Sequence, residues 1–242
     1  MSKRVFIIAM AFLCFNSAKA QPSKNAEAVY HQGVAFAAKE KYQEAMVSFF
    51  KAVKLYKDYD SAYVMMGDIN TKFNSYDTAM KFYKKALAIN PKNVRALNNL
   101  ATIYKNVEHN TNDALACYLK IIAIDSTNKE IFVFAAWCYN TLQHYDKAIP
   151  YAVKALDIDG NYRAAYGELG HSYHMSGKYA EGVEQFKKNI AVSHHEMPMF
   201  YAGLCYIELK DKVGANSMVD ELTKISSKLA ETLKKRIEKM EN

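Results

Sequence analysis

Residues 61–93, SAYVMMGDINTKFNSYDTAMKFYKKALAINPKN, contain a pattern of small and aromatic residues that recurs along most of the chain. The first small residue of the pattern returns at spacings of 33 to 35 residues, at Gly33, Gly67, Ala101, Ala136, Gly170 and Gly203. A second small residue follows twelve positions later in five of the six units, at Ala45, Ala79, Ala148, Gly182 and Ala215. In the remaining unit, Ala114 is one position late because that unit has one extra residue. This regular spacing indicates six copies of one structural unit.

Aromatic residues keep the same register. They stand three positions after the first small residue at Phe36, Tyr104, Tyr139, Tyr173 and Tyr206, and four after the second at Phe49, Tyr83, Tyr118 and Phe186. Two helices pack closely where a small residue of one meets a bulky residue of the other, so each unit is predicted to be a helix hairpin. Each hairpin has an apolar face that it cannot bury alone, so its stability is expected to come from stacking on its neighbours.

The pattern resembles that of the tetratricopeptide repeat (TPR) family, which has a large residue, Leu-Gly, Tyr, Ala, an aromatic residue and Pro in this order. The second unit matches around Ala79 at Tyr63, Met66, Gly67, Tyr83 and Pro91, and the fifth matches at Tyr166, Leu169, Gly170, Tyr173 and Phe186. The resemblance covers residues 26–225. It implies an all-α fold, a right-handed superhelix (α-solenoid) of about six TPR helix hairpins plus a C-terminal capping helix.

The predicted organisation has a short polar lead at residues 21–25 and six units at 26–59, 60–93, 94–128, 129–162, 163–195 and 196–225. A closing helix follows at residues 226–242, where an apolar stripe consists of Leu229, Leu233, Ile237 and Met240. This stripe is expected to cover the last unit, and to turn to water the basic residues Lys228, Lys234, Lys235, Arg236 and Lys239. In a rival interpretation, these basic residues contact an anionic membrane or lipopolysaccharide.

Residues 1–20 have the pattern of a secretory signal peptide that is cut before Gln21. Lys3 and Arg4 form a basic start, residues 5–15 an apolar run, and residues 18–20 a small-x-small end. The apolar run is too short to span a bilayer. The alternative is a buried amphipathic helix. The mature protein is therefore expected to be exported, periplasmic or secreted, without a transmembrane helix.

The net charge and the cysteine content argue against nucleic-acid binding and against a disulfide-stabilised scaffold. The formal net charge is +7, and removal of Lys3, Arg4 and Lys19 leaves 7 minus 3, or +4. The chain has no dense basic region with interleaved aromatic residues, so nucleic acid is not an expected partner. Three cysteines remain, Cys117, Cys138 and Cys205. Their number and wide spacing do not form a disulfide framework. Cys138 and Cys205 are expected to be buried apolar residues, and pairing of Cys117 with Cys138 is left open.

In the TPR family, the first helices of successive units line the concave surface. The register then places a set of partner-binding candidates there: Tyr30, Met65, Arg95, Asn98, Asn99, Phe134, Trp137, His171, His174, Phe200 and Tyr201. Val64, Asp68 and Val133 are predicted on the same face. Aromatic anchors beside amides suit an extended peptide or a helix of a protein partner. Trp137 could instead belong to the core. Some TPR relatives bind the acidic C-terminal tail of cytosolic chaperones through lysine, asparagine and arginine residues. Of these positions only Arg95 matches in this chain, so binding of that tail is not implied.

Motifs for chemistry are missing from the sequence. It has no Gly-rich phosphate loop, no cysteine pair at zinc spacing and no His-Glu-x-x-His run, so no cofactor, metal or enzymatic activity is expected. His171 and His174 could chelate a metal on one helix face or be an ordinary pair. The first hypothesis is an exported, non-catalytic adaptor that binds a peptide or protein in its concave groove in an envelope assembly. The alternatives are a structural spacer that self-associates and, last, an enzyme with an unrecognised site.

Overall fold

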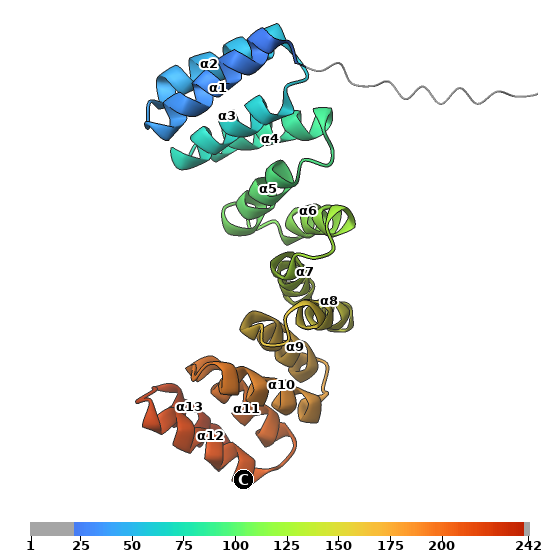
Figure 1. The fold of residues 1–242 in the computed structure, drawn as a ribbon. Coiled ribbons are helices and arrows are strands. Elements are labelled where there is room, and N and C mark those ends of the chain that lie inside the picture. The colour runs from blue at the N-terminus through green and yellow to red at the C-terminus, as the bar shows by residue number, and fades with distance from the viewer. Residues whose placement is uncertain (1–21, 240–242) are drawn as a thin grey trace, which may run out of the picture. The chain divides into compact units, whose positions relative to one another are not determined.

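The computed structural model describes residues 22–239, and all regular structure in this range is α-helical (Figure 1). The helices are α1 (Lys24–Ala38), α2 (Tyr42–Leu55), α3 (Asp60–Lys72), α4 (Tyr76–Ile89), α5 (Val94–Asn106), α6 (Thr111–Ile124), α7 (Lys129–Thr141), α8 (Tyr145–Ile158), α9 (Arg163–Met175), α10 (Tyr179–Val192), α11 (Glu196–Glu208), α12 (Lys212–Lys224) and α13 (Leu229–Glu238). The predicted all-α class is confirmed. The predicted leader, residues 1–20, and Met240 of the predicted stripe lie outside the described residues.

The chain divides into two compact units, Met1–Tyr59 and Asp60–Asn242. In the first unit, α1 packs on α2. A Cβ atom added to Gly33 on α1 would lie 2.7 Å from Cε1 of Phe49, which is fully buried on α2. The ring of Tyr30 lies 4.8 Å from that of Tyr59 between centroids. This unit is therefore one helix hairpin with its own aromatic cluster.

The second unit is a stack of hairpins in which each helix from α3 to α13 packs on the next along the chain. The first helices of successive hairpins also contact one another, since α3 contacts α5, and α9 contacts both α7 and α11. The exposed side of α3, α5, α7, α9 and α11 is called here the first-helix face. It carries most of the residues that the sequence predicts for partner binding.

Small residues allow each hairpin to close. A Cβ atom added to Gly67 on α3 would lie 2.4 Å from Cε1 of Tyr83 on α4, and one added to Gly170 on α9 would lie 2.7 Å from Cε1 of Phe186 on α10. Both rings are buried. The small-to-aromatic contacts that the spacing predicts are therefore present, and they hold the two helices of a hairpin at close distance.

Helix α13 closes the C-terminal end of the stack. Its Leu233 and Ile237 are buried in one cluster with Met199 and Leu222. A Cβ atom added to Gly203 on α11 would lie 2.4 Å from Cδ2 of Leu233, so this glycine receives the leucine of the closing helix. The basic side chains of α13 and its flanks are exposed, as expected for a capping helix.

The turn inside each hairpin uses a left-handed residue at the same repeat position. These residues have φ between 50° and 77°, at Glu40, Asn74, His109, Gln143, Gly177 and Lys210. Only one of them is glycine, although L-residues rarely adopt this conformation. The turn geometry therefore repeats without a repeated residue type.

The three cysteines are buried and free, so Cys117 and Cys138 form no disulfide in this structure. Burial raises the pKa of Cys117 to about 11, and those of Cys138 and Cys205 to about 12. They are neutral thiols that fill the core. Within residues 22–239, no helix combines the length and the apolar character needed to cross a membrane.

Candidate functional site

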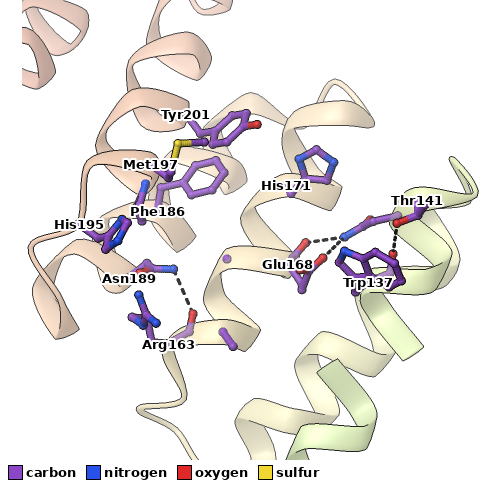
Figure 2. Close-up of a pocket in the computed structure, with 14 residues that line it drawn as sticks. Trp137, Thr141, Arg163, Glu168, His171, Phe186, Asn189, His195, Met197 and Tyr201 are labelled. Carbon is purple, nitrogen blue, oxygen red and sulfur yellow. Dashed lines mark hydrogen bonds between the residues drawn. The ribbon is translucent and has the colours of Figure 1, made fainter. Parts of the chain in front are cut away.

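A cavity of about 490 Å³ opens on the first-helix face between α7, α9, α10 and α11 (Figure 2). Three aromatic side chains line it, Trp137 from α7, Phe186 from α10 and Tyr201 from α11. Pockets of this size with apolar walls and a few polar groups are typical ligand sites. Trp137, His171 and Tyr201, which the sequence predicts for partner binding, all lie on its wall.

Helix α9 forms the floor of the cavity with one stripe of residues. Ala164, Gly167, Glu168 and His171 recur at spacings of three, one and three, which places them on one helix face. A Cβ atom added to Gly167 would meet Nδ2 of Asn189 at 3.4 Å, which is an ordinary van der Waals contact. That Nδ2 atom donates a hydrogen bond of 3.0 Å to the backbone oxygen of Arg163, which fixes α10 against the start of α9.

A buried polar cluster joins α7 to α9 at the cavity wall. The Nδ2 atom of Asn140 donates to Oε2 of Glu168 at 2.8 Å and to its backbone oxygen at 3.1 Å. The Oγ atom of Ser172 donates to Oδ1 of Asn140 at 2.7 Å, which fixes the orientation of the amide. Asn140 and Ser172 are buried, and Glu168 lines the cavity. We call these three residues the Asn140–Glu168–Ser172 cluster.

Burial raises the pKa of the Glu168 carboxyl, and the hydrogen bond from Asn140 and the charge of Lys105 oppose this shift in part. The direction shows that desolvation dominates the other two effects. Among the described residues, Glu168 takes part in no ion pair. The cavity therefore presents a carboxylate that is hydrogen-bonded but lacks a paired cation.

Trp137 lies between core and cavity. Part of the side chain packs against the core that α3 to α7 share, and part lines the cavity. The Nζ atom of Lys105 lies 4.9 Å from the Trp137 ring centroid and 4.7 Å from that of Phe134. Trp137 is therefore half-buried, and it belongs in part to the core and in part to the cavity wall.

The two histidines of α9 contact aromatic residues. The ring of His171 lies 5.9 Å from that of Tyr201, and Nδ1 of His174 lies 3.3 Å from Sγ of Cys205. Burial lowers the pKa of both histidines. Both imidazoles are therefore neutral near pH 7. Within residues 22–239, no group of three or more His, Cys, Asp or Glu residues could hold a metal ion.

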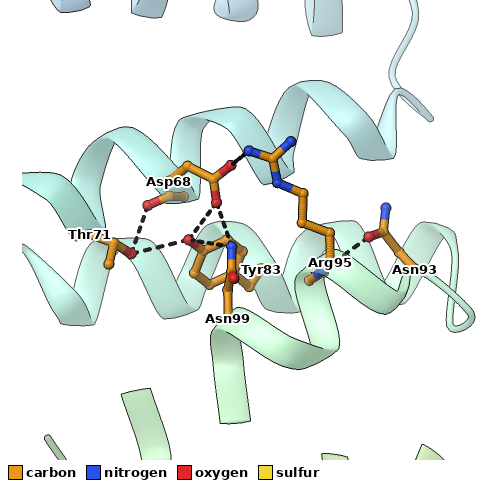
Figure 3. A network of polar contacts seen from close by, with 8 residues as sticks. Asp68, Thr71, Tyr83, Asn93, Arg95 and Asn99 are labelled. Atoms are coloured by element: carbon orange, nitrogen blue, oxygen red, sulfur yellow. Dashed lines mark hydrogen bonds and ion pairs between the residues drawn. The ribbon is translucent and has the colours of Figure 1, made fainter. Parts of the chain in front are cut away.

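A second cavity, of about 410 Å³, lies on the same face between α3, α4 and α5. Figure 3 shows the network of polar contacts that joins these helices. Asp68 accepts hydrogen bonds from the Tyr83 hydroxyl at 2.8 Å and from Nδ2 of Asn99 at 2.6 Å, and forms an ion pair with Arg95. Burial raises the pKa of Tyr83. Arg95 and Asn99, predicted to face a partner, thus bond to Asp68 within the chain.

The other residues predicted for partner binding line neither of the two cavities. Met65, Asn98 and Phe200 are half-buried, and Phe200 packs against the cluster under α13. Tyr30 belongs to the first unit. Two further predictions are wrong, because Val64 and Val133 are only 2% and 6% exposed and belong to the core. One residue along a helix rotates the side chain by about 100°, so neighbours of groove residues turn inward.

Asn140, Glu168 and Asn189 line the cavity without having been predicted. A signal for Glu168 was present, since it stands one turn before His171 in a predicted first helix. The register alone does not distinguish such a residue from other acidic residues on the surface. The hydrogen bonds of Asn140, which keep the carboxylate at the wall, depend on contacts between two units.

Comparison with known proteins identifies the repeats. Residues 67–107 match the family model of the TPR repeat, and residues 130–162 match that of the tetratricopeptide repeat. The chain contains tetratricopeptide repeats in these two segments. In fold it resembles the solved structure of YrrB, described as a TPR protein with an unusual peptide-binding site. The TM-score is 0.69 at 23% sequence identity, with coverage of 77% of this chain and 97% of YrrB.

A TPR protein from Parabacteroides merdae has a TM-score of 0.64 at 19% identity, covering 88% of this chain and 85% of that one. In sequence, the chain is 35% identical over 85 residues to the photosystem I assembly protein Ycf3 of Cyanophora paradoxa. It is 33% identical over 79 residues to the small glutamine-rich tetratricopeptide repeat-containing protein 2 of Mycosarcoma maydis. The matches span 34% and 33% of this chain, and 49% and 22% of those relatives.

Proposed function

We propose that the protein is a non-catalytic adaptor that binds a peptide or a protein segment on its first-helix face, with the cavity at Trp137 as the anchor site. One observation carries the proposal. Side chains from α7, α9 and α11, with Phe186 of α10, surround an open cavity with aromatic walls. Large aromatic side chains in such positions are the usual anchors of protein interfaces.

The comparisons support the general role. TPR repeats are protein-interaction modules, and YrrB, which has the same fold, is described as having a peptide-binding site. The other predicted residues are proposed as flanking contacts on the first-helix face of the second unit: Met65, Arg95, Asn98, Asn99, Phe134, His174 and Phe200. Tyr30 lies in the first unit, and it is proposed to contact a partner on that unit.

Loss of the anchor is expected to weaken binding. A peptide selected from a random displayed library on the full chain provides the probe, and isothermal titration calorimetry measures its affinity. Trp137→Ala removes the ring, and Thr141→Arg places a bulky side chain at the exposed rim without touching the core. Each variant is expected to weaken binding by about tenfold or more.

The matched control is Lys187→Ala, which changes an exposed residue of α10 outside the cavity. It should bind the peptide as the wild type does. Helical circular dichroism of all three variants should resemble that of the wild type. Unchanged affinity in both cavity variants would contradict the proposal, whatever their stability.

We further propose that the protein is exported and acts in an envelope assembly, as a periplasmic or secreted adaptor. The support is the sequence pattern of residues 1–20, with its basic start, apolar run and small-x-small end. Intact-mass spectrometry of the protein from its native host is then expected to give a chain that begins at Gln21. A mature chain that still begins at Met1 would refute export by this route.

A further inference from the structure

The Glu168 carboxylate is an incompletely satisfied charge at the cavity wall. Its Oε2 atom accepts from Asn140, whereas its Oε1 atom has no hydrogen-bond partner among residues 22–239. A half-buried carboxylate without a cation is stabilised by a ligand that supplies the opposite charge. Among the described residues, no cation is paired with the Glu168 carboxylate, so a cation of a ligand can pair with it.

The Asn140–Glu168–Ser172 cluster holds this carboxylate in place. Asn140 and Ser172 are buried on α7 and α9, and their hydrogen bond directs the Asn140 amide protons toward Glu168. A neutral glutamine at position 168 could accept the same hydrogen bond and join the two helices equally well. The negative charge itself is therefore not required by the contact between α7 and α9.

The walls around Glu168 suit a long side chain that ends in a cation. The rings of Trp137 and Tyr201 and the thioether of Met197 can pack against a methylene chain, and the buried Phe186 ring supports Tyr201 from behind. An aromatic face also attracts a cation, and Lys105 already lies over one ring of this wall, that of Trp137.

Cations of the chain itself limit what the cavity can accept. Arg163 lines the cavity, Lys105 lies on the Trp137 ring, and neither forms an ion pair with Glu168 among the described residues. The imidazoles of His171 and His195 also line the cavity. The positive charges of Arg163 and Lys105 oppose the entry of a strongly basic segment. One basic side chain between apolar neighbours therefore fits this surface better than a basic cluster.

We propose that Glu168 selects a partner peptide with a single lysine or arginine side chain, which enters the cavity and pairs with the carboxylate. This inference rests on the proposed peptide-binding function, and it adds the chemistry of the anchor residue. The ammonium or guanidinium group would donate to Glu168 while its aliphatic stem packs between the aromatic walls. The Asn140 and Ser172 side chains act as positioning residues that keep the carboxylate in the cavity.

Selection on two matched baits tests the inference. A random heptapeptide library displayed on phage is selected on the full wild-type chain and on Glu168→Gln. Peptides from the wild type are expected to be enriched in one lysine or arginine with apolar neighbours, and peptides from the variant are not. For a selected lysine peptide, calorimetry should then show about tenfold weaker binding after lysine is replaced by norleucine, and no such loss with the variant.

The stability of Glu168→Gln separates recognition from folding. The folded-state pKa of Glu168 is raised, so its charged form costs stability above that pKa, and stability recovers as the pH falls through it. Glutamine removes this charge and keeps the acceptor for Asn140. The variant is therefore expected to unfold at the same or a higher urea concentration than the wild type at pH 7.

The outcomes are distinct. Wild-type peptides without a basic residue, or equal affinity of the lysine and norleucine peptides for the wild type, would overturn the selection by Glu168 and leave peptide binding intact. This comparison needs no variant, so it stands even where Glu168→Gln fails to fold. Failure of the wild type to enrich any peptide would overturn both the proposed function and this inference.

Discussion

Gly67→Ala is expected to lower the free energy of unfolding by about 3 kcal/mol, at the upper end of the usual range for overpacking. The new Cβ atom would lie 2.4 Å from Cε1 and 2.8 Å from Cδ1 of Tyr83. Tyr83 is fully buried, and its hydroxyl is hydrogen-bonded to Asp68 and lies 3.1 Å from Thr71 Oγ1. The ring cannot move aside without breaking these bonds, so α3 and α4 must separate. Urea unfolding followed by circular dichroism measures the loss.

The control is Gly160→Ala, an exposed glycine whose added Cβ atom has its nearest contact at 3.9 Å. It is expected to change stability by less than about 0.5 kcal/mol. Together the two variants separate close helix packing from a general effect of glycine. Equal effects at both positions would show that Gly67 is not required for the approach of α3 and α4.

Leu233→Ala is expected to cost about 3 kcal/mol, because it leaves a cavity beneath the closing helix. Leu233 is fully buried in one cluster with Met199 and Leu222. Lys235→Ala, on the exposed side of the same helix, is the control and should be nearly neutral. Because the end of a repeat stack can open separately, hydrogen exchange of α11 to α13 is measured beside circular dichroism.

A double variant tests the same contact more sharply. A Cβ atom added to Gly203 would lie 2.4 Å from Cδ2 of Leu233, so Gly203→Ala alone is expected to destabilise. In Leu233→Ala the clashing atoms are gone, and the new methyl group partly fills the cavity. The two changes together should cost less than their sum by at least about 1 kcal/mol. If the loss of stability in the double variant equals the sum of the two single losses, Leu233 of α13 does not contact Gly203.

Much of the fold could be predicted because the packing of a hairpin depends on residue size. Gly67 and Tyr83 stand at fixed positions of the repeat, and the structure places them in direct contact. The turns could not be predicted in the same way. Glu40, Gln143 and Lys210 share a left-handed conformation that their chemistry does not specify, so the packing of the hairpin imposes it.

The site could be predicted only in part. The register placed Trp137, His171 and Tyr201 on one face, and the structure brings them to one cavity. It did not reveal that Asp68 would bond to Arg95 and Asn99, because this network joins side chains of two successive units. Glu168 was missed for a related reason, since its significance depends on Asn140 from the preceding unit.

The central claim is that a peptide binds at the cavity on the first-helix face. Trp137 is the only tryptophan of the chain, so its indole gives a single Nε1–H signal in a nitrogen-15 correlation spectrum. Titration with a selected peptide is predicted to shift or broaden this signal in proportion to the bound fraction. An indole signal that stays in place while backbone amide signals of other regions shift at saturation would contradict the claim.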